Sequence, residues 1–158
     1  MFSNLLLAVD GSEASLMAAR RGIELAKALN ARATIATVTV PWSAYFAREL
    51  AVVIPEVVVS KGGYDTQREA TAMGLLEKIA GEARRAGIEV TAVHRSHGDP
   101  YQAILDIAAK EACDVIVMGC HQAAGLTGAL LGSESMKLLA HSKVPVLVCR
   151  ASSERWAA

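Results

Sequence analysis

Five short apolar segments are spaced along the chain, separated by stretches in which apolar residues recur every three or four positions. Strands this apolar are buried on both faces, and helical crossovers between them are typical of a parallel sheet. Right-handed crossovers then carry helices to both sides. We therefore expect an α/β protein with a single doubly wound, five-stranded parallel sheet and helices on both faces, a Rossmann-like architecture. The expected strands are residues 4–9, 33–40, 88–93, 114–118 and 144–149.

Capping residues mark the helices expected between these strands. Ser12 stands before a helical apolar pattern as an N-cap, and Asn30 suits a left-handed stop. Asp99 has the same N-cap chemistry, and Pro100 follows it at the first helical position, where proline is favoured. Ser133 is the expected cap of the last helix.

The connection at 41–63 has no clear pattern, and Gly62 and Gly63 are expected to close it. A Thr-x-x-Glu capping box begins at Thr66, so the next helix is expected to start there. Gly87 is well placed to end this helix.

Length and charge are typical of an ordinary globular protein. The 158 residues suit one domain with one core, and 53% of them are apolar and 20% charged. Sixteen basic side chains balance sixteen acidic ones without a block of like charge, so neither nucleic acid nor membrane is an expected partner. No apolar stretch reaches ~20 residues, and no positive segment precedes the apolar start. We therefore expect a soluble, cytoplasmic protein.

Cysteine and histidine positions argue against disulfides and metal sites. Cys113, Cys120 and Cys149 are odd in number and lack C-x-x-C spacing. Buried thiols are expected at Cys113 and Cys149, whereas Cys120, in a glycine-rich loop, is a candidate for exposure and oxidation. His94 and His97 lie three apart on an extended segment, where side chains diverge, so no metal is expected.

In a doubly wound sheet, ligands bind beyond the carboxyl ends of the strands, where the strand order reverses. The loops at 10–12 and 119–133 are therefore the candidate site. Neither a dinucleotide fingerprint, a Walker A loop nor a G-x-S-x-G elbow is present. Two interpretations of Ser133, which follows Gly132, fit the sequence equally well. Its backbone amides form a phosphate site, or Ser133 is a plain helix cap. Asp10 is either a loop-capping carboxylate or a residue that meets a ribose or a metal-bound phosphate.

Four segments resemble the universal stress protein family and keep its order over nearly the whole chain. LLLAVDGSEAS resembles the family's first strand and loop, and HGDPYQAILDIA resembles the segment ahead of its signature. DVIVMGCHQAAGLTGALLGSES, followed by VPVLVCR, resembles the signature region and the closing strand. The resemblance implies an adenine-nucleotide alpha-hydrolase-like fold, with one domain over residues 1–150 and a C-terminal tail at 151–158.

The nucleotide-binding branch of this family has the signature G-x-x-G, nine residues, then G-S or G-T. The spacing from Gly119 to Gly132 fits, except that Gln122 stands where the second glycine is expected. A glutamine adds a Cβ where torsions suited to glycine are needed, and a branch that does not bind ATP also has it. The resemblance implies ATP, with or without Mg²⁺, as the ligand. The implied nucleotide-binding residues are Asp10, Val40, Met118, Gly119, His121, Gly132, Ser133 and Glu134.

Three functions are consistent with these residues. The first is a small stress-response protein that binds ATP or a related adenine nucleotide and signals, as a homodimer, to a partner that the sequence does not name. The second is a dimeric interaction protein whose site Gln122 closes. The third is a slow Mg²⁺-dependent ATPase that uses Asp10 or His121, although no catalytic base is identified. The last strand, from Val144 to Cys149, is a strongly apolar sheet edge, which favours dimerisation.

Overall fold

The computed structural model describes residues 1–44, 61–120 and 132–150. Within them the strands form one parallel sheet in the order β3-β2-β1-β4-β5. The order reverses between β1 and β4, which confirms the predicted doubly wound α/β class. The strands are β1 (Asn4–Ala8), β2 (Arg32–Thr39), β3 (Val90–Ser96), β4 (Val115–Cys120) and β5 (Val146–Arg150).

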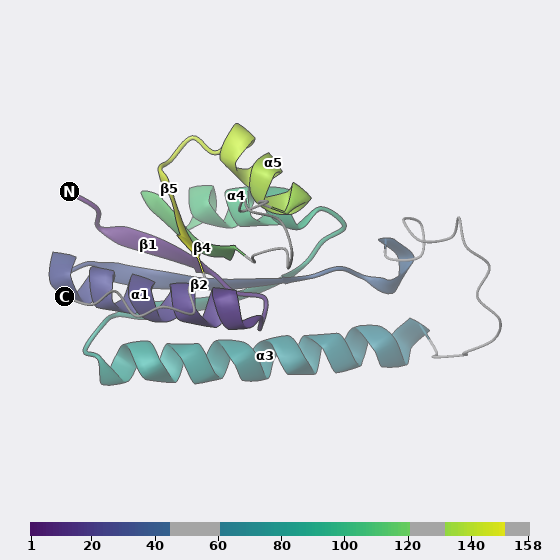
Figure 1. Cartoon of the computed structure of the whole chain (residues 1–158). Coiled ribbons are helices and arrows are strands. Elements are labelled where there is room, and N and C mark those ends of the chain that lie inside the picture. Colours follow the sequence, from purple (N-terminus) through teal and green to yellow (C-terminus); the bar gives the residue numbers. More distant parts are fainter. Residues whose placement is uncertain (45–60, 121–131, 151–158) are drawn as a thin grey trace.

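Helices cover both faces of this sheet (Figure 1). Helices α1 (Glu13–Leu29) and α3 (Lys61–Arg85) lie on one face, and α4 (Pro100–Lys110) and α5 (Ser133–His141) lie on the other. Helix α3 is the longest of these elements and extends past the sheet at its amino end (Figure 1). The predicted two-sided arrangement is therefore confirmed.

Alternation along β1 builds a hydrophobic core on each face. Leu5 and Leu7 pack with residues of α1 and α3, whereas Leu6 packs with residues of α4 and α5. All three leucines are fully buried. Burial of each such side chain contributes about 2 kcal/mol, so the central strand stabilises the packing on both faces of the sheet.

Helix α1 begins and ends where the sequence predicts. The Ser12 Oγ accepts a hydrogen bond from the Ser15 N–H at 3.2 Å, which is the expected N-cap. Asn30 adopts the left-handed conformation, with φ 52° and ψ 40°, and its N–H donates to carbonyls of the last turn.

Helix α3 begins at Lys61, not at the capping box at Thr66, and the two glycines expected to close the preceding connection lie in its first turn. The Asp65 Oδ1 accepts the Trp42 N–H at 2.9 Å, which ties the early part of this helix to the chain just after β2. Such a tertiary contact overrides a local capping signal. The predicted stop is confirmed, because Gly87 follows the helix with φ +84°.

Strand β4 continues through Gly119 to Cys120, so its predicted end at 118 is wrong. The strand continues because Gly119 and Cys120 still pair with Cys149 and Arg150 of β5. A Cβ at Gly119 would collide with the backbone carbonyl of Ala14 and lie 2.6 Å from the Ser15 nitrogen. Glycine is required here because the first turn of α1 lies directly against the strand.

Strands β3 and β5 both start two residues later than predicted. The Ile88 N–H still donates to the Ala83 carbonyl of α3 at 3.1 Å, and the register with β2 then continues as far as Ser96. The Val144 N–H donates to the Ser142 Oγ at 3.2 Å, so that residue belongs to the turn before β5.

Polar contacts hold the amino end of β1 against the start of β4. The Asp114 carboxylate accepts hydrogen bonds from the Ser3 N–H and Oγ, both at 2.7 Å, and from the Asn4 N–H at 3.2 Å. Burial alone would raise the pKa of Asp114, but these bonds hold that pKa below its ordinary range. The buried Asn4 side chain donates to the Glu111 carbonyl at 2.8 Å and accepts from Thr34 at 3.2 Å.

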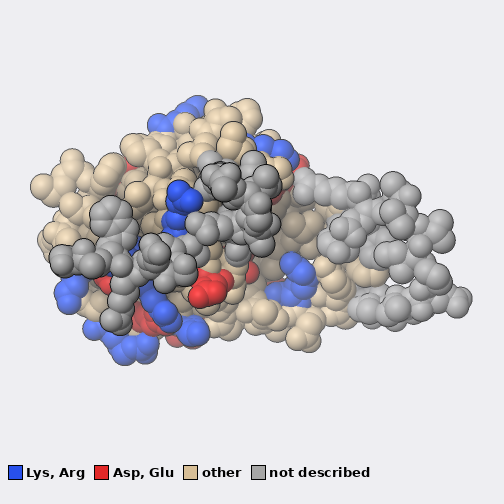
Figure 2. Space-filling view, viewed as in Figure 1, with Lys and Arg blue, Asp and Glu red and all other residues tan. Residues whose placement is uncertain are grey.

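Basic and acidic side chains lie close to one another on the face drawn in Figure 2. One exposed pair, Arg20 and Glu82, joins α1 to α3 at 3.4 Å. In the ranges that the structure describes, no helix has the length and hydropathy needed to span a membrane.

All three cysteines are free, as predicted. Cys113 is buried, as predicted, whereas Cys149 is only partly buried. Burial raises the pKa of both, which keeps them as thiols. Cys120 ends β4 and is only 3% exposed, so its predicted exposure is wrong. The strand runs two residues further than the apolar pattern indicates and carries Cys120 into the core.

We expect Gly119→Ala to lower the free energy of unfolding by about 2–3 kcal/mol, because its Cβ meets backbone that cannot move aside. The measurement is urea denaturation followed by circular dichroism. Gly74→Ala is the matched control: it lies within α3 and its Cβ would meet nothing within 4 Å, so it should be neutral or stabilise by up to about 1 kcal/mol. Equal stability of the two variants would contradict the close packing.

We expect Asp114→Asn to lower the free energy of unfolding by about 1 kcal/mol near neutral pH. A carboxyl whose pKa is depressed on folding stabilises the protein above its unfolded pKa, and this contribution disappears as the pH falls through the folded pKa. The difference between parent and variant should therefore shrink below about pH 4. Asp106→Asn, which removes an exposed carboxylate 4.0 Å from Arg95, should change stability less at every pH. A pH-independent difference for Asp114→Asn would refute this assignment.

Candidate functional site

A pocket of about 400 Å³ opens at the carboxyl ends of β1, β2 and β4, where the strand order reverses. Its volume is in the range of sites for small ligands. Most of its described lining is apolar, and Ala8, Ala36, Met118 and Leu138 contribute to it from three strands and α5. The position agrees with the rule for ligands of doubly wound sheets.

The turn from β1 into α1 forms one side of this pocket. Gly11 has φ +85°, a conformation that favours glycine, and the Asp10 Oδ1 accepts the Ser12 N–H at 2.9 Å. The Ser15 Oγ accepts the Asp10 N–H at 3.3 Å, and Ser15 also lines the pocket. Asp10 therefore does act as a loop cap, while remaining part of the pocket lining.

The amino ends of three helices reach the same pocket. Ser15 lies in the first turn of α1, Tyr101 in that of α4, and Ser135 in that of α5. Amide groups at helix starts lack partners within the helix and carry partial positive charge, which favours an anionic group nearby. Two of these residues already use their amides, because the Ser15 N–H donates to Ser12 and the Tyr101 N–H donates to Glu134.

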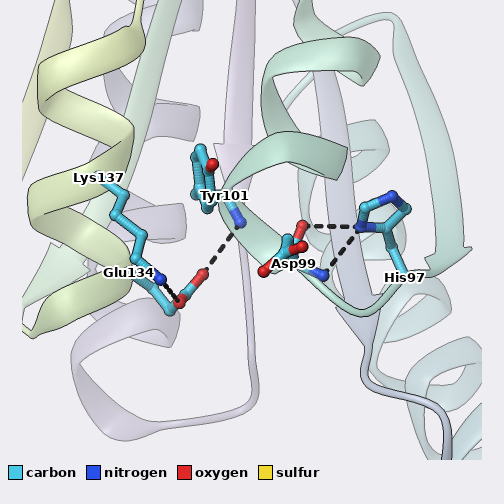
Figure 3. A network of polar contacts seen from close by, with 5 residues as sticks. All are labelled: His97, Asp99, Tyr101, Glu134 and Lys137. Carbon is cyan, nitrogen blue, oxygen red and sulfur yellow. Dashed lines mark hydrogen bonds and ion pairs between the residues drawn. The ribbon is translucent and has the colours of Figure 1, made fainter. Parts of the chain in front are cut away.

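Glu134 connects two of these helix starts (Figure 3). Its Oε2 accepts the backbone N–H of Tyr101 at 3.3 Å, and its Oε1 pairs with the Lys137 ammonium at 3.0 Å. Asp99, at the N-cap position of α4, makes no side-chain capping bond, so the carboxylate from α5 serves one of the first amides of α4. The Lys137 ammonium also lies 5.4 Å from the centre of the Tyr101 ring.

Two histidines near this region make hydrogen bonds within the protein. The His97 Nδ1 lies 2.9 Å from both the N and the O of Asp99, which shapes the turn before α4 (Figure 3). The His94 Nε2 lies 2.9 Å from the Thr39 Oγ1. Across the described residues, no group of three His, Cys, Asp or Glu side chains is arranged to hold a metal ion.

The structure brings together five of the residues that the sequence nominated for nucleotide binding. The residues that line the pocket are Asp10, Met118, Gly119, Gly132 and Glu134. Their role toward a ligand stays a prediction. His121 and Gln122 lie outside the described residues, as does most of the glycine-rich loop.

Ser133 and Val40 are not among the residues that line this pocket. Helix α5 begins at Ser133 with Gly132 as its N-cap, so the prediction that Ser133 is the cap is wrong. Val40 lines a separate hollow of about 220 Å³, next to His94 and Asp65, whereas Val38 lines the main pocket. Strand β2 ends at Thr39, so Val40 no longer follows the alternation that directs Val38 to the pocket.

Sequence reasoning missed several lining residues, including Ser15, Val38, Tyr101 and Ser135. Val38 had a local signal, because it lies two positions after Ala36 on one strand face. Tyr101 had no such local signal. It lies in α4, which follows β3, and α4 comes near the end of β1 only because β3 and β1 are in the same sheet.

The model of the universal stress protein family matches residues 1–150. A universal stress protein from Thermus aquaticus is 34% identical over 157 residues, covering 95% of this chain and all of the relative. The universal stress protein YxiE of Bacillus subtilis is 28% identical over 151 residues, with 95% of this chain and 100% of the relative covered.

Solved structures with the same fold include proteins described as nucleotide complexes. Universal stress protein UspA from Lactobacillus plantarum superposes with a TM-score of 0.73 at 20% identity, covering 94% of this chain and 98% of the other. A universal stress protein in complex with cAMP has a TM-score of 0.66 at 25% identity, with 96% and 99% covered. A family member from Arabidopsis thaliana with AMP bound has a TM-score of 0.64 at 15% identity, with 99% and 97% covered. On the family match across residues 1–150 and on these relatives, the chain belongs to the universal stress protein family.

Proposed function

We propose that this protein binds an adenine nucleotide in the pocket at the carboxyl ends of β1 and β4, and that the bound state is its signal in the stress response. The observation that carries the proposal is an apolar pocket of about 400 Å³ reached by the starts of three helices. The cAMP complex of a 25% identical family member supports the same ligand class. ATP, with or without Mg²⁺, is the ligand that the signature spacing favours.

The two parts of the pocket suit the two parts of a nucleotide. The apolar floor around Ala36, Val38 and Met118 suits a flat base, because it can bury the ring faces without unpaired polar groups. The helix starts near Ser15 and Ser135 suit the ribose and phosphate. Gly132 supports this orientation, since a Cβ there would meet nothing within 4 Å and the backbone is open to approach.

Val38→Phe should abolish adenine nucleotide binding, because the larger ring fills the floor of the pocket. The measurement is calorimetric titration of protein stripped of bound ligand with cAMP, AMP and ATP, the last with and without Mg²⁺. Val40→Phe is the matched control: it makes the same change two residues later, in the separate hollow, and should bind within about threefold of the parent, a change of under 1 kcal/mol. Loss of binding in Val40→Phe alone would instead support the assignment of Val40 to the adenine pocket.

A parent protein that binds none of these ligands would overturn nucleotide binding as its function. Gln122→Gly then identifies the reason, since recovery of binding in this variant means that the glutamine side chain closes the site. Gln122→Gly without binding would leave the family's interaction role as the better account. Circular dichroism of each variant checks that the fold is intact.

We also propose a homodimer formed through β5. In the described part of the chain β5 pairs with β4 alone, which leaves its other edge open. Leu147 on β5 is 42% exposed, and it points to the face opposite Val146 and Val148, which pack toward α4 and α5. An open strand edge that carries an exposed apolar side chain favours pairing with a second copy.

Leu147→Asp should weaken this dimer at least tenfold, because it puts a charge into an apolar interface and a second one opposite by symmetry. The measurement is sedimentation velocity across a micromolar concentration series. Met73→Asp, at a residue of α3 that is 53% exposed, should leave the association unchanged. A parent protein that sediments only as a monomer would overturn the proposed dimer.

A further inference from the structure

The charged side chains that line the pocket are all acidic in the described part of the chain. Asp10 and Glu134 contribute to its lining, and no Lys or Arg does. The segment 121–131, which leads from β4 to α5, reads HQAAGLTGALL and contains neither Lys nor Arg. Only His121 could bring a cation to the pocket from this segment. Among the described residues, the attraction for an anion therefore comes from backbone amides at the helix starts.

Glu134 occupies one of these amides itself. Its carboxylate accepts the Tyr101 N–H at the start of α4, where the phosphate of a ligand would also be favoured (Figure 3). A ligand phosphate close to this helix start must displace the carboxylate or lie beside it. In both arrangements the binding free energy becomes less favourable as the negative charge on the ligand increases, because like charges repel more strongly where water is partly excluded.

Lys137 partly neutralises the negative charge of Glu134. The Lys137 ammonium pairs with the Glu134 Oε1 at 3.0 Å, but Lys137 is not part of the described lining, and its side chain is 42% exposed. A partly exposed pair of this kind is screened by solvent and neutralises its carboxylate incompletely. The Glu134 carboxylate therefore still presents negative charge to a ligand in the pocket.

We propose that Glu134 is a specificity-determining residue that makes the pocket select adenine ligands of low charge, the nucleoside or a nucleotide with one phosphate, over the metal-free triphosphate. The inference rests on the proposed adenine nucleotide binding and narrows its ligand class. Mg²⁺ acts through the ligand, since its charge offsets that of the triphosphate and lowers the repulsion from Glu134. Selection is thus by charge, not by size.

The test is calorimetric titration of the parent and of Glu134→Gln with adenosine, AMP, ADP and ATP in the presence of EDTA. In the parent, affinity should fall from AMP to ATP. In Glu134→Gln the ratio of ATP to adenosine affinity should rise about tenfold, because the amide oxygen still accepts the Tyr101 N–H while the charge is gone. Glu77→Gln is the control: it makes the same charge change on exposed α3, where Glu77 pairs with Arg84, and should leave the ratio within about twofold.

Lys137→Gln tests the Glu134 charge by the opposite change, because it leaves that charge without its ion-pair partner. It leaves Glu134 in place but removes the partner, so discrimination against ATP should increase by about threefold. This variant also keeps the proposal falsifiable if Glu134→Gln does not fold. Addition of Mg²⁺ should reduce the discrimination in the parent and have less effect on it in Glu134→Gln.

The outcomes separate the two proposals. If adenosine, AMP, ADP and ATP all fail to bind the parent, nucleotide binding itself is overturned, and the charge selection with it. If they bind but ATP binds at least as tightly as AMP, and Glu134→Gln and Lys137→Gln leave the ratio unchanged, nucleotide binding stands and the role of Glu134 is overturned.

Discussion

The complete burial of β1 is the constraint on which the rest of the structure depends. Its residues from Asn4 to Leu7 are at most 2% exposed, and the strand pairs in parallel with β2 on one side and β4 on the other. A strand that is apolar on both faces requires helices above and below the sheet. Its one buried polar side chain, Asn4, needs partners, and its bonds to Thr34 and to the Glu111 carbonyl connect the central strand to β2 and to the end of α4.

The same constraint creates the pocket at the other end of β1. The chain leaves the sheet at Asp10, between strands whose connections run in opposite directions, so a space opens above their carboxyl ends. Gly119 lets the first turn of α1 lie against β4, which brings the start of that helix to the pocket. Gly119, which the family signature suggests for nucleotide contact, is therefore also required for the packing of α1 on β4. The proposed charge selection by Glu134 depends on this crowding of helix starts, because it lets a carboxylate of α5 accept an amide at the start of α4.

Some elements could be predicted well from the sequence, and others could not. The strands, the caps Ser12 and Asn30, and the stop at Gly87 follow from chemistry within a few residues of each position. The start of α3 was missed because Asp65 bonds to Trp42, far away in the sequence, and the capping box at Thr66 says nothing about that contact. Glu134 was nominated through the family signature, but its bond to Tyr101 joins two helices separated by a strand.

Taken alone, the amino-acid sequence determined the fold class, the order of strands and helices, most helix limits and the family resemblance, because apolar periodicity and capping act over short distances along the chain. Only the tertiary structure decided which residues share the pocket: that Val38 faces it and Val40 does not, and that Glu134 reaches the start of α4. The physical reason is that a pocket at a switch point is made of strand and helix ends that are distant in sequence. Their approach is set by the packing of β1 and by the absence of a side chain at Gly119.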